Sequence, residues 1–223
     1  MIQIPTSFII TKMKKIISII FCGAMMLAGT NAFAQLSVGA GYLNDTFKFS
    51  EGDFSDSFNS NGFYAGAFYN FTLAGNLSLN PGLYFSYLTG DTGDEIFYYD
   101  GKCTEMSLNV PLNFRYNLDL ASDTRLFVYA GPTFQYGLSA KFKPDVPTID
   151  IGPGEFSAKE RDLYDDDFYS RGDIKLGGGV GFELFDAIQV TVGYKYGLLN
   201  RVKDSDGVKI HHGTLNFGVA YLF

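Results

Sequence analysis

The chain offers few side chains of the kinds that catalysis or metal binding requires. Its two histidines, His211 and His212, are adjacent. On an extended strand their side chains would point to opposite faces, which makes a poor metal-binding pair. The run Asp165-Asp166-Asp167 offers oxygen ligands of the type that calcium prefers. Its spacing is not that of an EF-hand loop, so we interpret it as a solvated charge run.

The cysteines do not suggest chemistry either. Cys22 lies in an apolar N-terminal run behind the bulky Phe21, where lipid attachment requires a small residue, and Cys103 is a single thiol that forms neither an internal disulfide nor a metal site. The sequence contains no nucleophile elbow and no zinc-protease motif. We therefore expect no enzymatic activity, no cofactor and no bound metal.

A second set of charged residues occupies the polar sides of segments that are otherwise apolar on alternate positions. If these sides face an enclosed interior, the charges must pair with each other or with ordered water, because unpaired buried charge is very costly. The pattern predicts a pair between Arg115 and Glu183 near one end, with Asp173 and a lysine as a second layer. The alternative is a rim location in bulk water, where an ion pair contributes roughly 0–1 kcal/mol. The set is Arg115, Glu183, Asp173, Lys175 and Lys195.

These residues belong to segments with period-two alternation, which is typical of strands with two different faces. The clearest case is 106–118, where Met106, Leu108 and Val110 alternate with Ser107, Asn109 and Pro111. No segment shows a convincing helical period. We expect eight strands, at about residues 36–43, 62–73, 77–88, 105–118, 125–138, 171–185, 188–198 and 212–223.

The connections between these strands alternate in length. Short ones lie at 74–76, 119–124 and 186–187, and long polar ones at 44–61, 89–104 and 139–170, with a shorter one at 199–211. Outer-membrane barrels have short periplasmic turns and longer external loops. The sequence therefore predicts an all-β fold: an eight-stranded antiparallel up-and-down transmembrane β-barrel.

A soluble barrel such as a lipocalin is the competing fold, with its apolar side chains inside. Two features favour the membrane. Glycines repeat on the polar faces, as at Gly177, Gly179 and Gly181, and small residues suit a narrow interior. Aromatic residues sort to the two ends of the apolar faces, as in interfacial girdles. The external girdle is Tyr42, Phe63, Tyr87, Tyr136 and Tyr196, and the periplasmic one is Phe71, Tyr116, Tyr221 and Phe223.

The N-terminal region predicts export. Lys12, Lys14 and Lys15 precede the apolar run 16–27, which is short of the roughly 20 residues of a membrane helix, and Ala32-Phe33-Ala34 follows as a cleavage site. We expect residues 1–34 to be a signal peptide, with 1–12 a possible upstream start, and residues 35–223 to be the barrel domain. All 24 acidic residues lie in that domain, which argues against nucleic acid as a partner.

The placed segments resemble the PorT-like outer-membrane β-barrel family of Bacteroides-type bacteria. The similar pieces are 108–112 (LNVPL), 130–132 (AGP), 177–183 (GGGVGFE) and 194–198 (YKYGL), and alternate residues of 215–223 resemble the C-terminal signal of the outer-membrane assembly machinery. The resemblance covers essentially the whole barrel domain. It implies a fold and a location in the outer membrane of Gram-negative bacteria, without a single activity or any functional residue.

The function expected from these observations is a structural or interaction role through the external loops, by analogy with OmpX-like barrels. An accessory part of a secretion or assembly system, a small membrane enzyme and a narrow pore remain as alternatives. A wide channel is disfavoured because eight strands leave an interior just wide enough for side chains. The expected partners are outer-membrane lipid, the assembly machinery and a protein or glycan at the external loops.

Overall fold

The computed structural model describes residues 34–51, 54–92, 101–144, 149–150, 155–156, 161–164, 169–202 and 208–223. The predicted signal peptide up to residue 33, Cys22 and the run 165–167 lie outside these residues. None of the residues described forms a helix that is long and apolar enough to cross a membrane. The strands are β1 (Ala34–Glu51), β2 (Phe54–Ala74), β3 (Leu77–Thr92), β4 (Gly101–Ala121), β5 (Thr124–Pro144), β6 (Ile149–Asp150), β7 (Glu155–Phe156), β8 (Arg161–Asp162), β9 (Gly172–Leu184), β10 (Ile188–Gly197) and β11 (Val208–Leu222).

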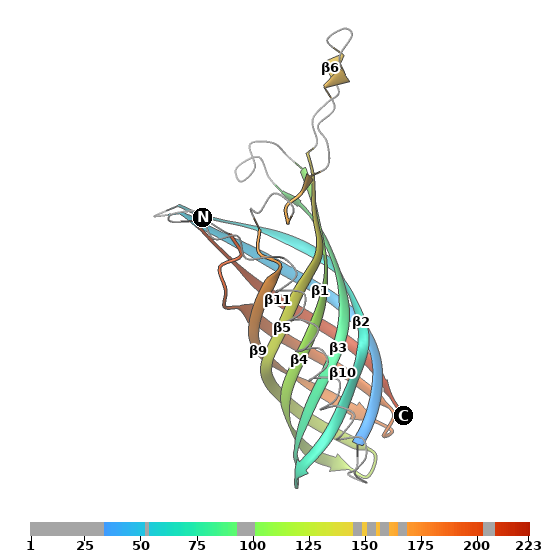
Figure 1. Cartoon of the computed structure of the whole chain (residues 1–223). Coiled ribbons are helices and arrows are strands. Elements are labelled where there is room, and N and C mark those ends of the chain that lie inside the picture. Colours follow the sequence, from blue (N-terminus) through green and yellow to red (C-terminus); the bar gives the residue numbers. More distant parts are fainter. Residues whose placement is uncertain are drawn as a thin grey trace, which may run out of the picture. The chain divides into compact units, whose positions relative to one another are not determined.

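Eight of these strands close into a barrel (Figure 1). Hydrogen-bonded neighbours follow the order β4-β3-β2-β1-β11-β10-β9-β5, and β5 pairs again with β4. The first and last strands meet in antiparallel register, from Ser37 opposite Leu222 to Glu51 opposite Val208. The predicted eight-stranded antiparallel barrel is therefore confirmed.

The three short connections are tight turns, as the sequence predicts. Gly75 has a φ of +52° in the β2–β3 turn, a conformation that glycine adopts without steric cost. In the β9–β10 turn Phe185 and Asp186 both have positive φ, and the N–H of Ala187 donates to the carbonyl of Leu184 at 3.1 Å. This pattern fits the right-handed twist of the paired strands.

The predicted long loops at 44–61 and 89–104 are largely wrong, because strands continue through most of both ranges. Strand β1 runs to Glu51 and β2 starts at Phe54, while β3 runs to Thr92 and β4 starts at Gly101. Strand β5 likewise reaches Pro144. A membrane-spanning strand needs about 9–11 residues. The 21 residues of β2, β4 and β5 therefore extend well beyond a bilayer.

The extensions invert the hydrophobic pattern of the membrane segments. Inside the barrel they bury Leu43, Phe47 and Leu88, while the neighbouring Asn44 and Thr46 face outward. Above the lipid the outer surface meets water, so apolar side chains gain by turning inward. The buried side chains form two apolar clusters, Leu43/Tyr64/Tyr84/Leu88 and Phe47/Ala140/Tyr164/Tyr169/Val202/Ile210.

Candidate functional site in the barrel lumen

The polar faces of the strands point into the lumen, as their composition predicts. On β4 the side chains of Ser107, Asn109 and Arg115 are buried, whereas Leu108 and Phe114 are exposed on the outer surface. The same alternation holds on β10, where Gln189 and Lys195 are buried between exposed apolar neighbours. The lumen is thus a polar compartment enclosed by a barrel with an apolar outer surface.

Glycines on β9, β10, β11 and β1 make room for aromatic rings inside this compartment. A Cβ atom at Gly41 would lie 2.5 Å from the ring of Tyr64, and one at Gly218 would clash with the hydroxyl of the same tyrosine. Gly179 and Gly193 leave similar space for the hydroxyl of Tyr129. The tyrosine rings of other strands therefore pack directly against the backbone of these glycines.

Arg115 and Glu183 form a buried ion pair toward the end of the barrel with short turns. Nη2 of Arg115 lies 2.6 Å from Oε2 of Glu183, and the two side chains are 3% and 2% exposed. The guanidinium also stacks on the ring of Phe127, at 3.7 Å from its centroid. The structure thus brings together the two residues that the strand pattern placed at one depth.

Further donors complete the surroundings of Glu183. Gln189 donates to Oε2 at 3.0 Å, and the guanidinium of Arg125 donates to Oε1. Arg125 is one-third exposed and also pairs with Asp119 and Asp186, at 3.3 and 2.9 Å. Glu183 therefore links the buried layer to charges at the rim.

A second charged layer centres on Asp45 of β1, a residue that the sequence pattern predicts to lie in a loop. Its carboxylate lies 3.5 Å from Nζ of Lys175, and it accepts from the hydroxyl of Thr214 at 2.9 Å. Nδ1 of His212 lies 3.1 Å from the same carboxylate. A carboxylate only accepts, so Nδ1 carries the hydrogen, and in the neutral ring Nε2 accepts from Tyr169 at 2.6 Å.

The predicted pairing of Asp173 with a lysine is wrong. Lys175 pairs with Asp45, and Asp173 accepts backbone N–H groups of Ile174 and Leu199 at 2.7 and 3.3 Å. The expected first strand ends at residue 43, whereas β1 continues to Glu51 and brings Asp45 into the lumen as the partner of Lys175. Lys195 has no carboxylate within ion-pair distance among the described residues.

A third cluster lies at the mouth with the long connections. Nη2 of Arg201 lies 2.8 Å from Oε1 of Glu105 and 2.9 Å from the hydroxyl of Tyr164, which itself donates to Glu105 at 2.8 Å. Nε of Arg201 donates to the carbonyl of Ser170 at 3.0 Å. The contacts connect residues of the segments 161–164, 169–171 and 199–202 to the wall at β4.

Burial and charge set the ionisation of the loop residues in this cluster. Burial raises the pKa of the Tyr164 hydroxyl well above its ordinary value, and the carboxylate of Glu105 raises it further. Burial disfavours the Arg201 cation, but Glu105 and the two neighbouring tyrosines outweigh that effect and raise its pKa. The arrangement is thus a neutral phenol between a fixed cation and a fixed carboxylate.

The two histidines point to opposite faces, as expected for a strand. His212 is fully buried, while His211 faces outward and stacks on Tyr196 at 5.7 Å between centroids. Cys103 is a buried free thiol. Among the described residues no three His, Cys, Asp or Glu side chains are grouped closely enough to hold a metal ion.

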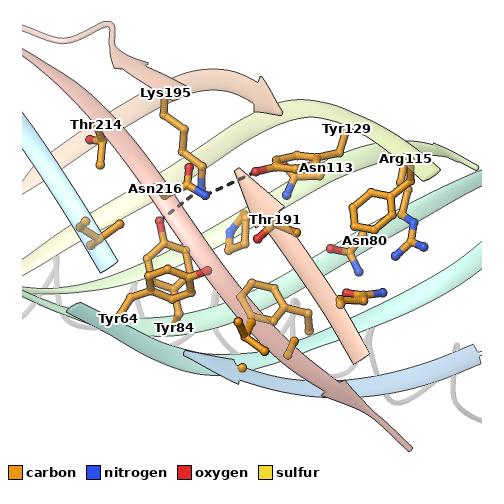
Figure 2. A pocket seen from close by; sticks show the side chains of 18 residues that line it. Tyr64, Asn80, Tyr84, Asn113, Arg115, Tyr129, Thr191, Lys195, Thr214 and Asn216 are labelled. Carbon is orange, nitrogen blue, oxygen red and sulfur yellow. Dashed lines mark hydrogen bonds between the residues drawn. The ribbon is translucent and has the colours of Figure 1, made fainter. Parts of the chain in front are cut away.

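Between the charged layers lies a cavity of about 80 Å³. Figure 2 shows the side chains that surround it, which come from most strands of the barrel. The lining includes Tyr64, Tyr129, Thr191, Lys195 and Asn216. Its volume accommodates a few waters, each with a share of about 30 Å³ in the liquid, and is far below the roughly 300–1,000 Å³ of a drug-sized ligand site.

The nine residues expected to form aromatic girdles all lie on the outer surface. Seven of them are exposed, and Phe71 and Tyr87 are half-buried between neighbours. Phe63 and Tyr87 pair across β2 and β3 with ring centroids 5.5 Å apart. At the opposite end Tyr221 and Phe223 meet at 5.0 Å.

An enclosed polar lumen, an apolar outer wall and aromatic side chains at both ends are the arrangement of a protein that crosses an outer membrane with strands. Comparison with protein families decides its membership. Residues 29–202 match the model of the outer membrane protein beta-barrel domain. The chain belongs to this family. Its members reside in the outer membrane of Gram-negative bacteria, and this chain is a small outer-membrane β-barrel protein.

Solved barrels of this kind are similar to the chain at low sequence identity. The Yersinia pestis attachment invasion locus protein Ail, in complex with the heparin analogue sucrose octasulfate, is 17% identical with a TM-score of 0.44, covering 85% of this chain and 99% of Ail. Neisserial surface protein A is 18% identical with a TM-score of 0.45, with the same coverage. The outer membrane enzyme PagL is 12% identical with a TM-score of 0.41, covering 85% of this chain and 98% of PagL. The search among curated proteins finds no match.

Proposed function

We propose that this outer-membrane barrel acts as a binding protein, and that its ligand meets the outward face of the strand extensions rather than the lumen. The observation that carries the proposal is the length of β1 to β4 beyond the external aromatic residues. Outside the Phe63–Tyr87 pair, the next outward row is Asn61 opposite Thr89. Two residues along a strand span about 7 Å, so this row lies at the level of lipid head groups.

Outward-facing side chains of β1 and β2 form hydrogen bonds across the two strands, and these bonds leave the amide NH2 groups of the β2 asparagines free to donate. Oδ1 of Asn61 accepts from Nδ2 of Asn44 at 2.8 Å and from the hydroxyl of Tyr42, and Oδ1 of Asn59 accepts from Thr46 at 2.7 Å. The amide carbonyls of Asn59 and Asn61 are thereby engaged, so their NH2 groups are the atoms left to donate.

A concave surface gathers these donors with a lysine and an aspartate that are opposite each other on β4 and β3. Asn59, Asn61, Thr89 and Gly90 line it together with Asp91 and Lys102. Lys102 and the two asparagines are exposed. Amide and ammonium donors fit an oxygen-rich anionic ligand. We propose the phosphorylated saccharide head group of an outer-leaflet glycolipid as that ligand.

The lumen supports a binding role over a pore or an enzyme. Three layers of paired side chains fill it, and the cavity between them is too small for an organic substrate. We propose that the protein is not an enzyme and that it forms no wide channel. Its motifs at 108–112 and 177–183 support a more specific PorT-like membership.

We further propose export through a cleaved signal peptide ending at Ala34, followed by insertion by the outer-membrane assembly machinery. The A-x-A site and the C-terminal alternation of Phe217, Val219, Tyr221 and Phe223 support these steps. N-terminal sequencing of the protein from isolated outer membranes tests them: the expected first residue is Gln35.

Binding is tested with the purified barrel in zwitterionic micelles, titrated with deep-rough lipopolysaccharide and, separately, with phosphatidylcholine. We expect saturable binding of the first only. Lys102→Ala should weaken it by roughly 10–100-fold, since a hydrogen bond to a charged group contributes about 1.5–3 kcal/mol. The Asn59→Ala/Asn61→Ala variant should weaken it as well. His211→Ala, at the external end outside the concave surface, is the matched control. Equal affinity for both lipids, or binding unchanged in both the Lys102→Ala and the Asn59→Ala/Asn61→Ala variants, would contradict the proposal.

A further inference from the structure

Lys195 is a buried lysine whose amino group forms no ion pair with an acidic side chain of the described structure. It projects from β10 into the lumen and is 8% exposed. Its Nζ donates to the hydroxyl of Tyr84 at 3.3 Å and lies 5.1 Å from the centroid of that ring. Neither contact neutralises a positive charge.

None of the acidic side chains of the described lumen forms an ion pair with Lys195. Asp45 binds Lys175, His212 and Thr214. Glu105 pairs with Arg201, and Glu183 pairs with Arg115 and Arg125. Asp173 accepts two backbone N–H groups at Oδ1, and its Oδ2 has no hydrogen-bond partner among the described residues. Of the lysines and arginines in the described lumen, Lys195 is thus the one left without a carboxylate at 4.0 Å or less. Removing an unpaired ammonium from water is very costly.

The cavity beside Lys195 is built to receive a counter-charge. Figure 2 shows the side chains of Lys195 and Tyr129 extending toward the same space, with the amide of Asn216 hydrogen-bonded to the Tyr129 hydroxyl. The hydroxyls of Tyr64 and Tyr129 can donate hydrogen bonds there, whereas the Thr191 hydroxyl donates to the carbonyl of Gly218 at 3.5 Å. Cation and hydroxyl donors around an enclosed space are the surroundings that an anion requires.

We propose that this cavity binds a small monovalent anion of halide size against the ammonium of Lys195. A volume of about 80 Å³ holds such an ion with one or two waters and is too small for a phosphorylated sugar. The bound anion balances the lysine and joins the charged layers on either side into a continuous polar core. The site is separate from the external surface proposed for glycolipid, so the failure of one proposal would not affect the other.

The proposal is tested on the refolded barrel in uncharged detergent. Its urea unfolding midpoint is measured in sodium bromide and in sodium gluconate at equal ionic strength, because gluconate is too large for the cavity. We expect bromide to raise the midpoint of the wild type in a saturable manner. Lys195→Met should abolish that rise, and in gluconate it should be at least as stable as the wild type because it carries no unpaired charge. Lys48→Met, at an exposed position of β1, should keep the full bromide response.

A second measurement locates the ion directly. Crystals grown in bromide should show one anomalous peak within hydrogen-bond distance of Lys195 Nζ, and crystals of Lys195→Met should lack it. Lys195→Gln serves in both measurements if the methionine variant does not fold. A wild type insensitive to bromide, or a bromide response that survives in the Lys195 variants, would overturn the proposal. A peak elsewhere in the lumen would do the same.

Discussion

Arg115 of β4 and Glu183 of β9 meet inside the barrel at 2.6 Å, across the intervening strand β5. Their positions are 68 residues apart in the chain. The pair is buried from both the solvent and the lipid, so each charge depends on the other.

Arg115→Met should therefore destabilise the barrel strongly, by about 3–5 kcal/mol, because it leaves the Glu183 carboxylate with one fewer buried cation. The joint replacement of Arg115 and Glu183 by Met and Leu should cost less than either single change. Arg125→Met is the matched control: it binds the same carboxylate but is one-third exposed, so solvent screening reduces its contribution. Urea unfolding in lipid vesicles measures all four. An Arg115→Met cost no greater than that of Arg125→Met would contradict the prediction.

The orientation of the outer surface is tested at Val219, which is 56% exposed and pairs with Val190 near the middle of its strand. Val219→Arg should cost about 2–4 kcal/mol in a bilayer, as a charge at the midplane of a barrel does. Leu36→Arg, at the end of β1 next to Phe223, should cost only about 0–1 kcal/mol. Similar costs at the two positions would place the membrane boundary elsewhere.

The packing of rings on glycines predicts a compensating pair. Gly218→Ala places a Cβ against the hydroxyl of Tyr64 and should destabilise by about 1–3 kcal/mol, as overpacking does. Adding Tyr64→Leu removes the obstacle and should recover part of that loss. Gly172→Ala is the control, since its Cβ would meet nothing within 4 Å, and it should change stability by less than about 0.5 kcal/mol. Additive effects of Gly218→Ala and Tyr64→Leu would mean that the two residues do not touch.

The loop tyrosines at the mouth predict a pH dependence. The pKa of Tyr164 is raised in the folded protein, so its stabilising effect is complete below the unfolded pKa of about 10 and is lost as pH rises through the folded value. Tyr169 shifts in the same direction because it is buried. In alkaline titration followed by tyrosine absorbance, which no tryptophan obscures in this chain, we expect a late class of phenols. Tyr164→Phe and Tyr169→Phe should each reduce that class, and denaturant should abolish it. A single transition for the folded protein would refute the prediction.

The difference between predicted and observed strand ends has one physical cause. Within the membrane the alternation is apolar outside and polar inside, so Arg115 and Glu183 could be assigned to the lumen from the sequence. Beyond the membrane the outer surface meets water and the pattern inverts, with Leu43 and Phe47 inside and Thr46 outside. If apolar residues are expected on the outside, as in the membrane, this stretch has no apolar outer face and its sequence resembles that of a loop. Asp45 was lost from the predicted lumen for this reason, and with it the true partner of Lys175.

His212 is the first residue of the last predicted strand, and its place in the lumen was not predicted, although the sequence held a usable signal. The alternation of Thr214, Asn216 and Gly218 on the inner face of β11 continues backward to His212 in unbroken steps of two. The contacts of Arg201 could not be foreseen, since they depend on how two connecting segments fold over the mouth. No local periodicity encodes such a contact.

The bonds of Asp45 to His212 and Thr214 join positions 167 and 169 residues apart, across the seam where β1 meets β11. These bonds exist only when the first and last strands are paired. Before that, the carboxylate can be hydrated and both strands have an unpaired edge. Closure of the seam therefore exchanges water at Asp45 for two fixed partners from β11, and the same step converts an open sheet into a closed cylinder.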